Sequence, residues 1–332
     1  ALRGNAAAVE FLLQQPSIEP NEANAEGITP AHCAVLSLLP SSVCQQQRRA
    51  QREKQGDKLQ DDDPAEHDPF ICLRLLHRAG AQLNVPDVNF YCTPAVYAAQ
   101  DGLADCLRFL HDEGGCDLSD KESMLLQAGG THSQRLTVRR PGTNVSGSGN
   151  MYSLAFIAAN DGHVNVLRVL HECVEYDFEG CPQYSMQNGS AAFAAAQSGH
   201  LDCLRFLHEE AGCDLADKEA MPPRIFGNGV EQPPLMLAMV AAEHGHLSCL
   251  KFLVQEASCE AWSTNANGAT AAWIAAHNDQ LDCLSFLADR SVLPPGISPG
   301  EALSAPNHAG HTPVFDAVRR GAVDTLKLLL SF

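Results

Sequence analysis

The pattern of apolar and polar positions is clearest between Gly189 and Glu219, where it predicts two short helices joined by a turn. Ser190 precedes a run of small residues, and its hydroxyl is expected to cap the first helix by accepting a backbone N–H. Gly199 is expected to end that helix, because glycine adopts the left-handed conformation at little cost. The second helix, from about Leu201 to Glu210, places leucines three residues apart on one apolar face. A helix pair of this size cannot bury both of its faces alone, so it needs similar pairs on either side.

Copies of this pattern recur along the chain. The intervals from Ala1 to Val35 and from Ala242 to Ala276 are both 34 residues, and the longer intervals contain this unit plus an insertion. The second helix recurs as well, in segments that resemble Cys203–His208. A repeat of about 33 residues that holds two helices and a turn is typical of one class of solenoid. In each copy a pair of small residues, called the small pair below, precedes the turn that ends the first helix. The second residue of the small pair is Ala1, Val35, Ala99, Ala159, Ala196, Ala242, Ala276 and Val318 in the successive copies.

Several short motifs point to one family of such repeats. The segment Thr29-Pro30-Ala31-His32 is close to a Thr-Pro-Leu-His box, Gly199-His200 joins two helices, and Gly80–Asn84 is an altered Gly-Ala-Asp-Val-Asn. On these motifs the chain resembles the ankyrin repeat family. The resemblance implies an all-α solenoid of helix-turn-helix units with loop or β-turn fingers and inserted loops. Only His32 keeps the histidine of the box, which in the family ties neighbouring repeats by hydrogen bonds, so apolar packing is expected to join the other repeats.

We expect a single solenoid domain over residues 1–332, with about eight repeats. Residues 45–59 could form a helix but are more typical of a loop, residues 135–139 alternate like a strand, and the prolines of 221–234 predict a stiff loop. The last repeat ends on the apolar run 328–332, so more chain or a partner protein is expected to cover it. The expected repeats are residues 1–26 (partial), 27–87 with an insertion at 37–67, 88–121, 152–180 after an insertion at 122–151, 189–220, 235–266 after the loop 221–234, 267–291, and 309–332 after an insertion at 292–308.

Thirteen cysteines would suggest disulfides or zinc if their spacing were ignored. Five of them occupy the same position of the second helix, and equivalent points on packed helices lie roughly 8–10 Å apart, whereas a disulfide needs Cα atoms within about 7 Å. They are therefore expected to be buried free thiols, which favours an intracellular, reducing compartment (the cytosol, the nucleus or the interior of an organelle), with the true N-terminus not seen. The five are Cys72, Cys106, Cys203, Cys249 and Cys283.

Charge and motifs exclude several classes of function. The formal net charge of −18 disfavours nucleic acid and is compatible with basic partners or with solubility alone. No apolar run is long enough for a membrane span, and neither a phosphate-binding glycine loop nor a zinc-binding helix motif occurs. The pairs His244/His246 and His308/His311 are ascribed to turns and loops, so no metal and no cofactor is expected. The row His77, His111, His171 and His208 is interpreted as partly exposed residues of the stack, and we expect no enzyme.

What remains is a surface for a protein partner. In the family the concave groove is lined by the first helices and the loop tips, and the resemblance places the two residues after each small pair on it. The function expected is therefore a non-enzymatic protein–protein interaction scaffold. The alternative is an architectural or accessory subunit of a larger assembly, or the repeat region of a longer protein, that contacts its partners through the insertions. The groove residues implied are Tyr97, Gln100, Asp101, Asn160, Asp161, Gln197, Ser198, Glu243, His244, Ile274, His277, Asn278, Arg319 and Arg320, and the loop tips are Asp120, Lys121, Asp217, Lys218, Asn265 and Asn267.

Overall fold

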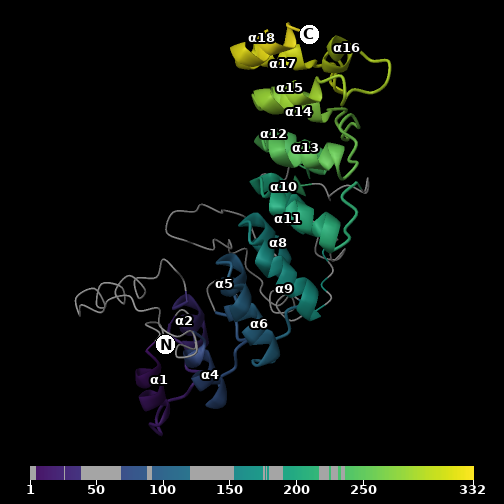
Figure 1. Ribbon diagram of the computed structural model, residues 1–332. Helices are drawn as coiled ribbons and strands as arrows, with labels where there is room; N and C mark the ends of the chain where they lie inside the picture. Colours follow the sequence, from purple (N-terminus) through teal and green to yellow (C-terminus); the bar gives the residue numbers. More distant parts are fainter. Residues whose placement is uncertain are drawn as a thin grey trace, which may run out of the picture. The chain divides into compact units, whose positions relative to one another are not determined.

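The chain divides into two compact units. Figure 1 labels the helices of the chain. Unit 1 comprises Ala1–Leu154 and Arg168–Tyr176, and unit 2 comprises Ala155–Leu167 and Asp177–Phe332. The expectation of one continuous domain with eight repeats stays a prediction. No helix within the described residues combines the length and the apolar character that crossing a bilayer requires. The computed structural model describes residues 5–25, 27–38, 69–87, 92–119, 153–174, 176, 178, 190–216, 224–225, 231–232 and 236–332.

The regular secondary structure of the described residues is helical apart from one two-residue ladder, which confirms the predicted all-α class. Helix α8 begins on the last residue of the first segment of unit 1, and α9 contributes residues to both units. The helices of unit 1 and its boundary are α1 (Ala6–Leu13), α2 (Pro30–Leu36), α4 (Ile71–Arg78), α5 (Pro94–Gln100), α6 (Ala104–Asp112), α8 (Leu154–Asn160) and α9 (Val164–Val174). Those of unit 2 are α10 (Ala191–Ser198), α11 (Leu201–Arg205), the π-helical turn η1 (Phe206–Glu210), α12 (Leu237–His244), α13 (Leu247–Gln255), α14 (Ala271–His277), α15 (Leu281–Leu287), α16 (Pro299–Leu303), α17 (Pro313–Arg320) and α18 (Val323–Leu329).

The repeat that begins at Ser190 folds as its sequence predicts. The Ser190 hydroxyl accepts a hydrogen bond from the Phe193 N–H at 3.3 Å, and Gly199 ends α10 with a φ of +81°. The second helix covers the predicted span, but its second half, η1, has the wider hydrogen-bond spacing of a π-helix. Leu204 and Leu207 are fully buried, so the predicted apolar face is the buried face.

Neighbouring repeats stack helix on helix. In unit 2 the first helices pack in the order α10, α12, α14 and α17, while the second helices pack in the order α11, α13, α15 and α18. Figure 1 shows these pairs as successive layers, from green to yellow. In unit 1, α2 packs on α5 and α1 packs on α4. Alanines at the centre of the first helices, such as Ala241 and Ala275, are fully buried, because small residues let adjacent helices approach closely.

Two loops contain elements that the sequence analysis missed. In the stiff loop predicted at 221–234, strands β1 (Arg224–Ile225) and β2 (Glu231–Gln232) form an antiparallel ladder. The two proline pairs lie just outside the paired positions, so every paired residue keeps its backbone N–H. The helix and strand considered at 45–59 and 135–139 lie outside the described residues.

The insertion predicted at 292–308 contains the short helix α16. Ser298 and Glu301 form a capping box, in which the Ser298 hydroxyl accepts from the Glu301 N–H at 3.3 Å and the Glu301 carboxylate accepts from the Ser298 N–H at 2.9 Å. Ala302 and Leu303 are buried and anchor the helix to the core. Serine, proline and glutamate at this spacing are the sequence signal of such a helix start, although the proline and glycine content of the segment is typical of a loop.

The five cysteines at the common second-helix position are buried free thiols, as predicted. Burial raises the pKa of Cys106 and of Cys203 to about 12. It raises the pKa of Cys249 and of Cys283 to about 11. These thiols therefore stay protonated near neutral pH and pack as small apolar groups.

Candidate functional site

The polar residues that end the first helices form one row in unit 2, which we call the turn row. Because α10, α12, α14 and α17 stack in order, their C-terminal ends become neighbours. Direct contacts show the adjacency: the Ser198 hydroxyl donates to Asn160 Oδ1 at 3.1 Å, and Gln197 Nε2 lies 3.5 Å from His244 Nε2. Most of the row is half-buried, while His244, Arg319 and Arg320 are exposed. The turn row comprises Asn160, Asp161, Gln197, Ser198, Glu243, His244, His277, Asn278, Arg319 and Arg320.

A repeated hydrogen bond holds the backbone of the turn row. His200 Nε2 lies 3.0 Å from the Asn160 carbonyl oxygen, and His246 Nε2 lies 2.9 Å from that of Gln197. A carbonyl oxygen can only accept, so each imidazole donates from Nε2 to the preceding repeat. The sequence analysis assigned the joining of most repeats to apolar packing, and that expectation was incomplete, because the histidine of the turn makes the polar link between repeats.

The same turns depend on glycine for two reasons. Gly199 has a φ of +81°, and a Cβ atom placed on it would lie 2.5 Å from His246 Nδ1. Gly212, which ends the second helix of the same repeat, has a φ of +73° but no atom within 4 Å of such a Cβ. Gly199 is therefore required both by its left-handed backbone and by the imidazole of the next repeat, which lies against it.

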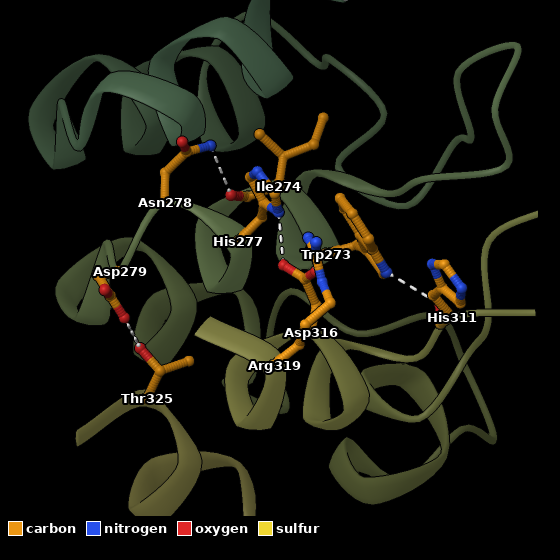
Figure 2. Close-up of polar contacts among 9 residues, drawn as sticks. All are labelled: Trp273, Ile274, His277, Asn278, Asp279, His311, Asp316, Arg319 and Thr325. Carbon is orange, nitrogen blue, oxygen red and sulfur yellow. Dashed lines mark hydrogen bonds and ion pairs between the residues drawn. The ribbon is translucent and has the colours of Figure 1, made fainter. Parts of the chain in front are cut away.

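The most elaborate contacts of the row join α14 to α17, as Figure 2 shows. Asp316 is 2% exposed, and one of its carboxylate oxygens accepts from His277 Nδ1 at 2.5 Å. The other accepts from Arg319 Nη2 at 2.7 Å. Burial acts to raise the pKa of the Asp316 carboxyl, but the hydrogen bonds and charges of Arg319 and His277 outweigh it and hold the pKa below its ordinary value. The carboxylate fixes the orientation of two residues of the turn row.

Asp316 was missed by the sequence analysis, although the predicted groove residues Tyr97 and Ile274 occupy the same position of their helices. It occupies the helix position of Tyr97, Val240 and Ile274, two residues before the second residue of the small pair. Ile274 is 7% exposed and Val240 is fully buried. Close packing of the alanine-rich helices covers most of this position and makes it a contact between repeats, and the expectation that Ile274 lines the groove stays a prediction.

Further contacts among the residues of Figure 2 lie within α14 or connect the same two repeats. Trp273 Nε1 donates to the His311 carbonyl oxygen at 3.1 Å, and the Trp273 and His277 rings stack with their centroids 5.2 Å apart. The Thr325 hydroxyl donates to Asp279 Oδ1 at 2.6 Å. Asn278 Nδ2 donates to the Ile274 carbonyl oxygen of its own helix at 3.0 Å. The side chains around His277 are thus fixed by the stack before any partner binds.

Residues 238–332, which contain α12 to α18, match the family model of ankyrin repeats with three copies. This match supports an assignment of the chain to the ankyrin-repeat family. Ankyrin repeats are in general protein–protein interaction modules and are typically non-enzymatic. A comparison with curated proteins gives no match.

The ankyrin box of unit 1 keeps the histidine that the resemblance implies. His32 Nδ1 accepts from the Thr29 N–H at 3.1 Å, and its Nε2 lies 2.9 Å from the Cys92 carbonyl oxygen of the next repeat. Burial lowers the pKa of His32, so the ring is neutral near neutral pH. Tyr97 lies edge-on to His32 and donates its hydroxyl to Asp87 at 3.1 Å, so this proposed groove residue also serves the contact between repeats.

The other expected ankyrin surface residues remain predictions. Gln100 and Asp101 are half-buried at the end of α5. At the described finger, Asn265 Oδ1 accepts from the N–H groups of Asn267 and Ala269, both at 3.0 Å, so the Asn265 side chain shapes the turn, while Asn267 is exposed. The tips expected at Asp120, Lys121, Asp217 and Lys218 lie outside the described residues.

A second set of contacts between successive repeats lies on the second helices. Arg205 pairs with Glu256 of the next repeat at 2.9 Å and lies over the Phe252 ring, 5.0 Å from its centroid. Arg74 makes the same two contacts in unit 1, with Glu113 and Phe109. Arg205 also pairs with Glu209 of its own helix. The sequence analysis missed the contacts between repeats, because they join residues about 40–50 apart.

Several histidines singled out in the sequence take part in contacts of the stack. His246 is used by the link to Gln197, while the ring of His244 lies 6.2 Å from that of His246 between centroids. In the periodic histidine row, His111 and His208 are half-buried and lie beside the carbonyl oxygens of Cys116 and Cys213. These two imidazoles therefore close the ends of their helices.

Proposed function

We propose that the chain is a non-enzymatic scaffold that binds a protein or an extended peptide along the turn row of unit 2. The observation that carries this proposal is the stacking of α10, α12, α14 and α17, which brings polar side chains from consecutive repeats into one line. These side chains are held by contacts such as His277–Asp316, so a partner meets a surface that is already ordered. Binding to an ordered surface costs less conformational entropy.

The charges of the row suggest the chemistry of the partner. Arg319 and Arg320 are exposed at the C-terminal end of α17, in a chain whose formal net charge is −18. The charge of Arg319 is partly met by Asp316, whereas Arg320 forms no ion pair with any residue that the structure describes. We therefore propose that an acidic group of the partner binds at this end, and that polar, uncharged groups bind along the rest of the row.

A capture experiment tests the proposal once affinity purification and mass spectrometry have identified a partner. The row variant combines His244→Glu with Arg320→Glu, two exposed positions where a change leaves the core intact. The matched control combines Ser285→Glu with Lys327→Glu on the exposed faces of α15 and α18, which changes the charge by the same amount. We expect the row variant to lose capture and the control to keep it, with equal melting temperatures.

Two outcomes would overturn the proposal. Capture that survives in the row variant but is lost when residues 40–66 or 124–150 are deleted would show that the insertions make the contacts. Equal loss in the row variant and in the control would show that binding depends on net charge and not on the turn row.

We also propose that the protein works in a reducing compartment. The eleven cysteines within the described residues are all free thiols. Disulfides persist in oxidising compartments, and this large number of free thiols therefore fits a reducing compartment.

A further inference from the structure

Three side chains that can bind metal converge in unit 1, at the C-terminal ends of α6 and α9. His111 and Asp112 are the last two residues of α6, and Cys173 is the last but one of α9. Their ligand atoms all lie within 4.8 Å of one another, and this is the one such group in the part of the chain that the structure describes. The group combines an imidazole, a carboxylate and a thiol from two successive repeats.

Cys173 departs from the pattern of the other repeats. At the equivalent position, the second helices of three other repeats carry a glutamate, namely Glu113, Glu210 and Glu256. Cys173 is half-buried, whereas the cysteines at the common core position are buried. A core thiol is explained by packing, but packing does not explain a thiol that replaces a surface glutamate beside His111.

The contact that His111 makes leaves its Nε2 able to bind a metal ion. Its Nδ1 lies 3.2 Å from the Cys116 carbonyl oxygen, which can only accept, so Nδ1 carries the proton and Nε2 keeps a lone pair. Histidines that bind metal commonly donate their other ring N–H to a carbonyl or carboxylate in this way. His208 makes the same kind of contact with Cys213 at 3.4 Å, but no cysteine aligns beside it at the position of Cys173.

Charge also favours a cation at this place. Asp112 and a Cys173 thiolate would supply two negative charges. Arg108, whose charge acts on Cys173, is paired with Glu172 at 2.5 Å, so its charge opposes a bound ion less. Arg74 and Arg205 pair with glutamates at the repeat position that Cys173 occupies here. The glutamate partner of Arg108 lies one position earlier in its repeat.

We propose that His111, Asp112 and Cys173 bind one Zn²⁺ ion, with water as the fourth ligand. Zinc is four-coordinate with nitrogen, sulfur and oxygen ligands at about 2.0–2.3 Å, which places ligand atoms roughly 3.5 Å apart. The present separations have to shrink by about 1 Å, and rotation of these three partly exposed side chains achieves this without repacking the core. The ion would join the repeats on either side of the insertion at 122–151 and stabilise their contact.

Titration of the full chain with Co²⁺, a spectroscopic substitute for Zn²⁺, tests the proposal. We expect one Co²⁺ per chain, a near-ultraviolet thiolate-to-metal charge-transfer band, and loss of that band when Zn²⁺ is added. Cys173→Ser should abolish the band, and His111→Gln should weaken affinity by about tenfold or more, since even the loss of a partner in the outer shell costs 10–100-fold. Added Zn²⁺ should raise the melting temperature of the wild type but not that of Cys173→Ser.

Matched variants separate this site from binding elsewhere. Cys33→Ser changes the other half-buried cysteine among the described residues, and His208→Gln changes the equivalent histidine of another repeat. Both should bind Co²⁺ like the wild type. A wild type without the charge-transfer band, a band that persists in Cys173→Ser, or a band that is lost in Cys33→Ser would each overturn the proposal. Circular dichroism of the metal-free proteins confirms that all variants are equally folded.

Discussion

Asp316 is a buried carboxylate that holds one imidazole and one guanidinium of the turn row in place. A buried charge is tolerated only where hydrogen bonds and opposite charges compensate for its lost hydration. Arg319 and His277 provide this compensation from the same helix and from the preceding repeat. Asp316 therefore contributes at once to stability and to the shape of the proposed binding surface.

Asp316→Asn should destabilise unit 2 by about 1–3 kcal/mol near neutral pH, because it removes hydrogen bonds to a charged group. The pKa of Asp316 is lower in the folded protein than its ordinary value of 3.8, so the carboxylate stabilises the fold above that value. This contribution is lost as the pH falls through the folded pKa. The free energy of unfolding, measured in urea, should therefore differ most between wild type and Asp316→Asn near pH 7. The difference should shrink in strong acid.

Asp324→Asn is the control for this measurement. Asp324 is 74% exposed and pairs with Lys327 on the surface of α18, where an ion pair contributes little. Its variant should unfold like the wild type at both pH values. Equal effects of the two substitutions would contradict the role assigned to Asp316.

At the scale of elements, each helix pair is linked to the next by its turn. The imidazole of one turn donates to a backbone carbonyl of the preceding turn and lies against its glycine, as His246 does with Gln197 and Gly199. On the second helices, arginines such as Arg205 pair with the following repeat. Both links join residues in successive repeats, so an element is ordered by its neighbour as much as by its own sequence.

Gly199→Ala and Gly212→Ala should differ in cost although both place alanine at a positive φ. Gly212→Ala should lower the free energy of unfolding by about 1–2 kcal/mol through backbone strain alone. Gly199→Ala should lower it by more, because its Cβ would collide with the His246 ring and break the bond to Gln197. Thermal unfolding measures both. Adding His246→Ala should reduce the excess cost of Gly199→Ala, and a purely additive double variant would count against the contact.

At the scale of the whole molecule, the chain is built from repeats that depend on their neighbours. In α12, which packs against both α10 and α14, Ala238, Val240 and Ala242 are fully buried. The last repeat differs, since Val318 is 60% exposed and Val323 is 58% exposed. The protection of backbone amides from hydrogen exchange is therefore expected to differ between the helices of unit 2.

Hydrogen exchange followed by mass spectrometry should show this gradient. Amides of α12 and α13 should exchange slowest within unit 2, and those of α17 and α18 should exchange much faster, since they have fewer buried apolar contacts. Asp316→Asn should speed exchange in α17 and α18 more than in α12. Uniform exchange rates over these four helices would show that unit 2 unfolds as one body and not repeat by repeat.

The sequence by itself determined the repeat and most of its local structure. Ser190 as cap, Gly199 as helix end and the buried cysteines could be predicted, because capping, backbone conformation and apolar periodicity depend on residues a few positions apart. The helix α16 could also have been predicted from its capping box. The family of the repeat followed from the recurrence of these local signals.

Only the tertiary structure decided which side chains meet across repeats. Asp316 with His277, His246 with Gln197, and Ile274 in its buried position depend on how closely neighbouring helices approach. The convergence of His111 and Asp112 with Cys173 is of the same kind, since these residues are separated in sequence by an insertion. A local pattern fixes which face of a helix is buried, but the distance between two helices is set by the packing of both, and no single stretch of sequence contains it.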